Sequence, residues 1–246
     1  DDEERLKKVK EEIEEKAKRL KEDLERALKR YEDIIKKLED DNRKVLERIR
    51  RKVEELKKNR VTSKDIEKAL REIIEEIKRL NRENVKEIRR LNEEVKELLD
   101  RILRALEEII REITDLLDKS VKDEEKLRKI KEKLEKVLRE IEKDVRDLKR
   151  KHDELLKRVD DISRKIEEDL DRVAEKIRRI LSKPVDDELI RKALEELLRI
   201  AEEILRRDLR LLEENRRVVK ESLDVLAELL ERLLELLERI LREVRK

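Results

Sequence analysis

The stretch KNRVTSKDIEKAL (58–70) separates two long segments in which apolar residues recur at helical spacing. Ser63 can cap a helix that begins here, because its hydroxyl accepts hydrogen bonds from the free N–H groups of the first turn. Val61, just outside that cap, can pack onto the same turn. A connection of about four or five residues is typical of neighbouring helices in bundles. The stretch therefore predicts that the helices on either side of it are antiparallel.

Two more stretches repeat this arrangement, LDKSVKDEEKL (117–127) and LSKPVDDELIRKAL (181–194). In the first, Val121 precedes a capping Asp123, and in the second, Val185 precedes a capping Asp187. Pro184 cannot continue a helix and disfavours helical geometry at the residue before it. At ~1.5 Å per residue, the four helices between these breaks are each about 85 Å long, which predicts one rod rather than two globular domains. They run over about 2–58, 63–118, 123–181 and 187–245.

The apolar positions repeat every eighteen residues. Eighteen residues make about five turns of an undistorted α-helix, so this period keeps one face inward without a supercoil. In 2–58 the inward positions are Leu6, Val9, Ile13, Ala17 and Leu20, then Leu24, Ala27, Tyr31, Ile35 and Leu38, then Asn42, Val45, Ile49, Val53 and Leu56. The segment 63–118 follows the same spacing from Ile66 to Leu116. The sequence predicts an all-α fold, a single antiparallel up-down-up-down four-helix bundle over 1–246 with long, nearly straight helices.

The composition excludes several classes of partner. The 246 residues are 58% charged with a net charge of +2, and both signs are interspersed, so no basic block follows phosphates. With Tyr31 as the one aromatic residue, stacking platforms for bases are missing as well. No apolar run approaches the ~18 residues of a membrane span, and no signal peptide is recognisable. We therefore expect no nucleic acid and no membrane, and a soluble chain that is cytoplasmic in a recombinant host.

Polar residues occupy positions that the repeat otherwise fills with Leu, Ile or Val. Asn42 takes the slot of Leu24, and His152, the single histidine, takes the slot of Leu134. Asn81 and Asn92 lie on the flank of the apolar face of 63–118. The residues predicted to form a buried polar network are Tyr31, Asn42, Asn81, Asn84, Asn92, His152, Ser163, Asp208, Asn215 and Ser222.

Folding the chain back at each connection sorts these residues by height along the bundle. One layer takes one residue from each helix: Asn42, Asn81, Ser163 and Asp208. A second layer, about 16 Å away, does the same; it holds Tyr31, Asn92, His152 and Ser222. Asn84 and Asn215 fall between the two. A buried polar atom without a partner costs ~1–3 kcal/mol, so we expect each layer to satisfy its own members and to disfavour other registers.

The chain resembles de novo designed helical bundles that are generated parametrically with buried hydrogen-bond networks. The resemblance covers all 246 residues and rests on the period of eighteen, the three valine-containing loops, the Lys/Glu/Arg surface and the layered polar residues. It is carried also by the absence of glycine, since natural chains of this length use it for left-handed turns and helix C-caps. The resemblance implies a structural scaffold or engineered specificity module with no natural substrate.

Catalytic interpretations of the polar residues are weak. Ser163, His152 and Asp208 supply the residue types of a hydrolytic triad, but the layers place Asp208 about 15 Å from His152, beyond the reach of a proton relay. A chain without glycine offers no phosphate loop. Lys149 stands where a di-metal bundle has the glutamate of its Glu-x-x-His motif. We expect no enzyme activity, no cofactor and no metal.

Burial of two titratable groups predicts mild pH sensitivity. Desolvation should hold His152 neutral and should raise the pKa of Asp208, unless nearby donors stabilise the charge of its carboxylate.

The segment 187–245 has the widest apolar arc, approaching 200°, against roughly 120° for an ordinary bundle helix. Its extra residues lie on both sides of the inward face, such as Leu198, Leu205 and Leu223 on one flank and Ile200, Leu211 and Leu229 on the other. The favoured interpretation is a monomer in which this helix and 63–118 face each other closely across the axis. The alternative is that this face mediates self-association or binds a partner helix.

Overall fold

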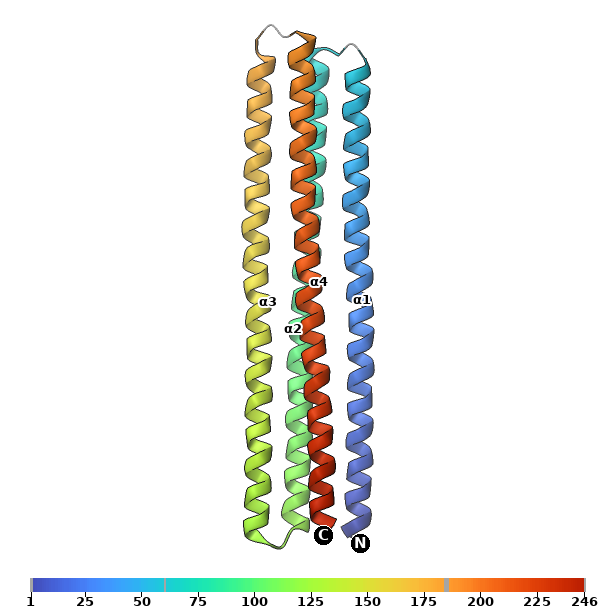
Figure 1. The fold of residues 1–246 in the computed structure, drawn as a ribbon, viewed down its shortest axis with the longest axis vertical. Helices are drawn as coiled ribbons and strands as arrows, with labels where there is room; N and C mark the ends of the chain where they lie inside the picture. The colour runs from blue at the N-terminus through green and yellow to red at the C-terminus, as the bar shows by residue number, and fades with distance from the viewer. Residues whose placement is uncertain (1, 60, 184–185, 246) are drawn as a thin grey trace. The chain divides into compact units, whose positions relative to one another are not determined.

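The computed structural model describes residues 2–59, 61–183 and 186–245, and the side chains of 4–5, 7–59, 61–183 and 186–243. The side chain of Leu6, and Pro184 and Val185, all of which figure in the sequence-based predictions, lie outside this range. Within it the chain forms four continuous α-helices and no strand (Figure 1). They are α1 (Asp2–Lys58), α2 (Ser63–Ser120), α3 (Glu124–Leu181) and α4 (Asp187–Arg245). The predicted boundaries are confirmed to within two residues.

The residues group into two compact units, each of which takes a segment from all four helices. The first comprises Asp1–Tyr31, Asn92–Asp153 and Arg217–Lys246, and the second comprises Glu32–Leu91 and Glu154–Arg216. In each unit the four segments pack as a helical bundle around an aliphatic core. A single bundle over 1–246 stays a prediction.

Ion pairs show that neighbouring helices are antiparallel. In the second unit, α2 and α3 are joined by Lys78–Asp171, Arg82–Glu167 and Arg89–Asp160. From the first to the last of these pairs the residue number rises by 11 on α2 and falls by 11 on α3. In the first unit, Lys96–Asp153 and Asp100–Lys149 follow the same rule. Other pairs join α1 to α2, α3 to α4, and α4 to α1, for example Arg48–Glu76, Arg158–Glu214 and Arg50–Glu202.

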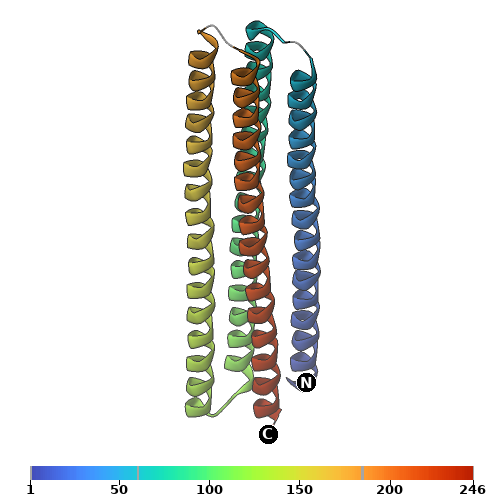
Figure 2. The ribbon, with the colours of Figure 1, turned by 45° about the horizontal axis from the view of Figure 1, so that its top comes forward.

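In each unit α2 and α4 lie between α1 and α3 (Figures 1 and 2). Burial follows this arrangement: of the described side chains, 21 on α2 and 20 on α4 are buried, against 10 on α1 and 14 on α3. The apolar arcs of α2 and α4 are wider because these two helices face each other across the core and also contact both other helices. In the second unit a hydrogen bond from Asn84 of α2 to Asp208 of α4 crosses this diagonal, as predicted, and in the first unit the close approach of α2 and α4 stays a prediction.

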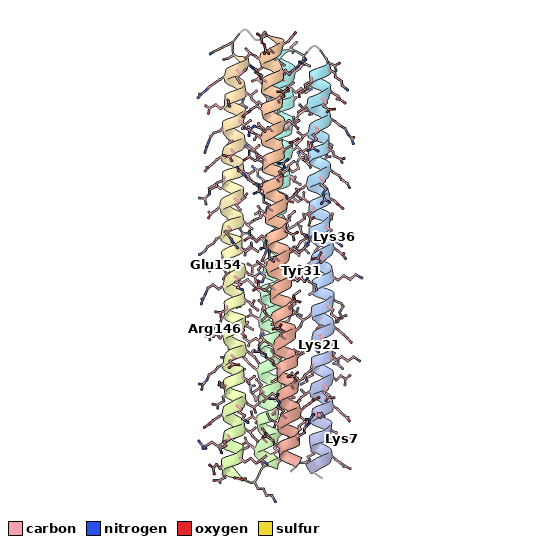
Figure 3. All side chains as sticks on the ribbon, viewed as in Figure 1. Lys7, Lys21, Tyr31, Lys36, Arg146 and Glu154 are labelled. Atoms are coloured by element: carbon pink, nitrogen blue, oxygen red, sulfur yellow. The ribbon has the colours of Figure 1, made fainter. Side chains whose placement is uncertain are left out.

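The eighteen-residue period predicts most of the buried positions, whereas Val9, Leu20, Ala27 and Leu56 of α1 are only half-buried. Ile13, Tyr31 and Ile49 share one slot of α1 and are 1%, 4% and 1% exposed. Charged residues occupy the opposite faces, and Figure 3 shows Lys7, Lys36 and Arg146 projecting away from the helices. Each unit therefore has an aliphatic interior and a surface of mixed charge.

The helix caps correct two of the predictions. α2 is capped by Thr62 rather than Ser63: the amide of Asp65 donates to Oγ1 of Thr62 over 3.3 Å, and the carboxylate of Asp65 accepts from the amide and hydroxyl of Thr62. This reciprocal capping box lowers the pKa of Asp65. With Thr62 as cap, Val61 stands directly before it and Ile66 four residues after it. Ile66 belongs to the core cluster of the second unit and Val61 packs against that cluster, as expected for a hydrophobic staple.

α4 is capped by Asp186 rather than Asp187, because the amide of Leu189 donates to Oδ1 of Asp186 over 2.9 Å. Asp187 is then the first helical residue, where a negative charge interacts favourably with the helix dipole. The cap predicted at Asp123 is confirmed, since its Oδ1 accepts from the amides of Glu125 and Lys126. No described residue has a positive φ, and this includes the described residues of the three connections.

Candidate functional site: three buried polar clusters

His152 of α3 lies in the core of the first unit, with no exposed surface. Its Nδ1 lies 2.7 Å from Oδ1 of Asn92 on α2, and its Nε2 lies 2.8 Å from Oγ of Ser222 on α4. One side chain thus connects three helices, and we name these three residues the histidine cluster. Both ring nitrogens of His152 are taken by protein partners.

The partners determine the tautomer of the ring. The amide oxygen of Asn92 can only accept, so Nδ1 carries a proton and donates it. In the neutral ring Nε2 is then an acceptor, and the hydroxyl of Ser222 donates to it. Burial lowers the pKa of His152 from 6.5 to about 4, with Asp153 raising it and Lys96 lowering it by smaller amounts. The last two side chains are paired with each other over 2.7 Å, which explains their small net influence.

A second cluster occupies the core of the second unit and consists of Asn42 on α1, Asn84 on α2 and Asp208 on α4. The Nδ2 of Asn84 donates to Oδ1 of Asn42 over 3.0 Å and to Oδ2 of Asp208 over 3.5 Å. All three side chains are 1% exposed. Burial raises the pKa of Asp208 from 3.8 to about 7, and the hydrogen bond from Asn84 opposes this shift. We name this group the aspartate cluster.

The third cluster is a pair in the second unit. The Nδ2 of Asn81 on α2 donates to Oγ of Ser163 on α3 over 2.9 Å, and it lies 3.4 Å from the carbonyl oxygen of the same serine. Asn81 is 1% exposed, whereas Ser163 is only half-buried. The predicted burial therefore holds for Asn81 and is partial for Ser163.

The remaining two predicted residues are buried. Asn215 of α4 has no exposed surface, and Tyr31 of α1 is 4% exposed. Tyr31 borders a surface groove of the first unit between α1 and α2, together with Arg30, Glu94 and Arg101. Burial raises its pKa above the usual range, and the negative charge of Glu94 raises it further.

The predicted layers are wrong in three details. Asn84, which we placed between the layers, is the residue that joins Asn42 to Asp208. Asn81 and Ser163, which we placed with those two, form a separate pair. In the described part of the chain His152 is bonded to Asn92 and Ser222, whereas no hydrogen bond joins it to Tyr31. The height of a residue along a helix was known from the sequence only to about one turn, and Asn81 and Asn84 are one turn apart.

The sequence did not predict one charged cluster, which surrounds Arg216. Arg216 of α4, in the second unit, pairs with Glu32 and Glu39 of α1 and with Glu213 of its own helix. Its side chain is 20% exposed, the most buried arginine of the described ion pairs. The signal was the position of Arg216 beside the inward Asn215, which places it at the margin of the core.

The geometry gives these clusters little chemistry beyond mutual hydrogen bonding. The three residue types of a hydrolytic triad have different partners: Ser163 bonds Asn81, His152 bonds Asn92 and Ser222, and Asp208 bonds Asn84. Among the described residues no group of three or more His, Cys, Asp or Glu side chains could hold a metal ion. None of the helices, over their described residues, has the length and apolar character needed to cross a membrane.

The wide apolar face of α4 is largely covered by its own unit. In the first unit Leu223, Leu229 and Leu241 are at most 5% exposed, and in the second Leu205 and Leu211 are at most 3% exposed. Several others are half-buried: Leu198, Ile200, Val218, Val225, Leu234 and Leu236. Leu189, near the start of α4, is 42% exposed and is the one large apolar side chain classed as exposed among those described.

Comparison with known proteins finds no matching family model, no matching curated protein and no matching solved structure.

Proposed function

We propose that this chain is a designed structural scaffold without a natural biochemical activity, in which buried polar clusters specify the fold. The observation that carries the proposal is the bonding of His152: one ring nitrogen is bonded to α2 and the other to α4. Neither nitrogen is left for a metal or a substrate proton. The single histidine therefore has a structural use that accounts for its burial.

The sequence supports a designed origin independently of the clusters. A chain of 246 residues with no glycine, no cysteine, no methionine and an eighteen-residue period has the features of a parametrically generated bundle. The loops also fit, because Thr62, Asp123 and Asp186 supply a side-chain cap at each of the three helix starts that follow a loop.

The clusters favour one arrangement because their members lie on different helices. An alternative register, or a bundle that turns in the opposite direction, would bury His152, Asn92 and Ser222 against aliphatic side chains. Each unsatisfied buried group would then cost ~1–3 kcal/mol. An aliphatic core of similar volume imposes no such penalty and tolerates several arrangements.

The experiment that tests this proposal compares the histidine cluster of the parent chain with an apolar replacement. The triple variant Asn92→Leu, His152→Leu and Ser222→Ala removes every polar partner together. It should keep the helical content of the parent. Its free energy of unfolding should equal or exceed that of the parent, because no buried group is left unpaired. The single variant His152→Leu should be less stable than either, because buried Oδ1 of Asn92 loses the N–H that the ring donates to it.

Specificity is measured by thiol crosslinking, since the chain contains no cysteine. Lys149 and Asp100 pair over 3.0 Å across α2 and α3, so Lys149→Cys with Asp100→Cys reports the native register. Lys149→Cys with Lys96→Cys, one turn away, reports a shifted register. The parent should crosslink only the first pair, and the triple variant should crosslink both. Crosslinking confined to the first pair in the triple variant contradicts the proposed role of the histidine cluster.

The alternative proposal is association through α4, and its support is the exposed Leu189. Measurement of molar mass by light scattering over a hundredfold range of concentration separates the two proposals. A constant mass of one chain is expected for the scaffold, and a mass that rises with concentration favours association. Leu189→Lys would then show whether this residue belongs to the interface.

A further inference from the structure

The aspartate cluster leaves three buried polar atoms without a partner. The Nδ2 of Asn84 donates to Asn42 and to Asp208, which uses both of its N–H groups. The atoms left over are Nδ2 of Asn42, Oδ1 of Asn84 and Oδ1 of Asp208. Two of the three, Oδ1 of Asn84 and Oδ1 of Asp208, are acceptors on residues that already face each other, so a donor is missing between these two oxygens.

An ionised Asp208 does not fit this surrounding. None of the ion pairs formed by the described residues includes it, and its neighbour Arg207 is paired with Asp169 of α3 and with Glu203 of α4. Its hydrogen-bond partner on α2 is the neutral amide of Asn84, which is bonded in turn to the neutral amide of Asn42 on α1. Its hydrogen bond from Asn84 is 3.5 Å long, whereas N–H donors approach a carboxylate to roughly 2.7–2.9 Å. A buried carboxylate with no cation and one long bond is strongly disfavoured.

We propose that Asp208 is a buried proton-binding site: in the folded protein it is a neutral carboxylic acid that donates its proton to Oδ1 of Asn84. The site takes one proton from solvent, which forms one O–H bond on the carboxyl group, and releases the same proton when the group ionises. The acid and the amide then face each other through two hydrogen bonds, N–H to Oδ2 and O–H to Oδ1. Rotation of the carboxyl group about its terminal torsion, which is soft, is sufficient to align the second bond.

The pKa of Asp208, raised by burial from 3.8 to about 7, agrees with this arrangement. Between these two values the folded chain holds a proton that the unfolded chain has lost. Folding is therefore favoured most below pH 3.8, and this contribution disappears as the pH rises towards 7. The direction is opposite to that of an aspartate stabilised by a salt bridge.

The first test uses Asp208→Asn, which is nearly isosteric and neutral at every pH. The control is Asp224→Asn, an exposed position on the same helix. Between about pH 4 and pH 8 the unfolding equilibrium constant of the parent should rise, relative to that of Asp208→Asn, by a factor on the order of several hundred. The unfolding equilibrium constant of the parent, divided by that of Asp224→Asn, should stay nearly constant over the same pH range. If the unfolding equilibrium constant of the parent divided by that of Asp208→Asn is equally constant, the proposal is overturned.

The second test needs only the parent, so it holds even if Asp208→Asn does not fold. At about pH 6.5, more than two pH units above the usual pKa of an aspartate or glutamate side chain, the infrared spectrum should retain the carbonyl stretch of a protonated carboxylic acid, which is separate from the carboxylate bands. The stretch should disappear above about pH 8. A spectrum at about pH 6.5 without this band shows that Asp208 is ionised and overturns the proposal.

Discussion

The Nε2 of His152 lies 2.8 Å from Oγ of Ser222, and the same hydroxyl lies 2.9 Å from the carbonyl oxygen of Val218. A hydroxyl has one proton, so it can donate to only one of these two acceptors. When the ring is neutral, Ser222 donates to Nε2. When the ring is protonated, Nε2 donates to Ser222, which then donates to Val218. The histidine cluster keeps its hydrogen bonds in both states, and the penalty for protonation is the burial of the charge.

This arrangement predicts that stability falls in acid through His152. Its pKa is about 4 in the folded chain and 6.5 as a free side chain, so the unfolded chain binds more protons between these values. The contribution of His152 to the free energy of unfolding is complete above pH 6.5. It is lost as the pH falls towards 4, and the total loss is roughly 3 kcal/mol. Denaturant unfolding of the parent and of His152→Gln should show this difference between about pH 7.5 and pH 4. If the unfolding curves of the parent and of His152→Gln are separated by the same denaturant concentration at both pH values, this prediction is contradicted.

Removal of the Ser222 hydroxyl should destabilise the chain through His152. Ser222→Ala leaves Nε2 of the neutral ring without a donor, which costs about 1–3 kcal/mol for a buried group. In the His152→Leu background the same change should cost much less. The double-mutant cycle measures the coupling, and a coupling energy near zero would mean that the two side chains do not interact in solution.

The caps provide a prediction with a built-in control. Asp186 accepts the amide of Leu189, whereas its neighbour Asp187 is the first residue of α4. Asp186→Ala should therefore cost about 0.5–2 kcal/mol of unfolding free energy, and Asp187→Ala should cost less because it removes only a favourable charge near the helix dipole. Thermal or denaturant unfolding of the two variants shows which of the two residues caps α4. A larger loss for Asp187→Ala would place the cap at Asp187, as the sequence predicted, and equal losses would contradict a cap at Asp186 alone.

Core truncation should distinguish buried from exposed leucines on α4. Leu212 has no exposed surface, and Leu189 is 42% exposed. Leu212→Ala should destabilise by about 2–5 kcal/mol through lost burial and the cavity left behind. Leu189→Ala should stay within about 0.5 kcal/mol of the parent. A loss at Leu189 comparable to that at Leu212, in a sample whose mass is one chain, would show that the start of α4 packs differently.

The sequence was sufficient to predict the helices and the burial of most polar residues. At about 100° per residue, eighteen residues return a side chain to the same direction, which is why Asn42, His152 and Asp208 could be assigned to the core. The partners could not be assigned in the same way. Height along the bundle depends on the geometry of each loop, and an error of one turn exchanges Asn81 with Asn84 as the partner of Asn42.

The errors at the caps have a similar local cause. Thr62 and Ser63, and likewise Asp186 and Asp187, are adjacent residues that can both cap a helix. Which one does so depends on where the loop places the first helical residue, and the sequence pattern does not determine this. Tyr31 differs again: its slot is inward, but a side chain this long reaches the groove beside Glu94 and Arg101 instead of His152.

The central claim is that buried polar side chains of different helices bond one another, and the single histidine allows a direct test by NMR. One imidazole gives one set of ring ¹⁵N signals, which report the protonation of each nitrogen. Our interpretation predicts a proton on Nδ1, an unprotonated Nε2 at neutral pH, and titration near pH 4. A ring that titrates near 6.5, or that carries its proton on Nε2 at neutral pH, would contradict the account.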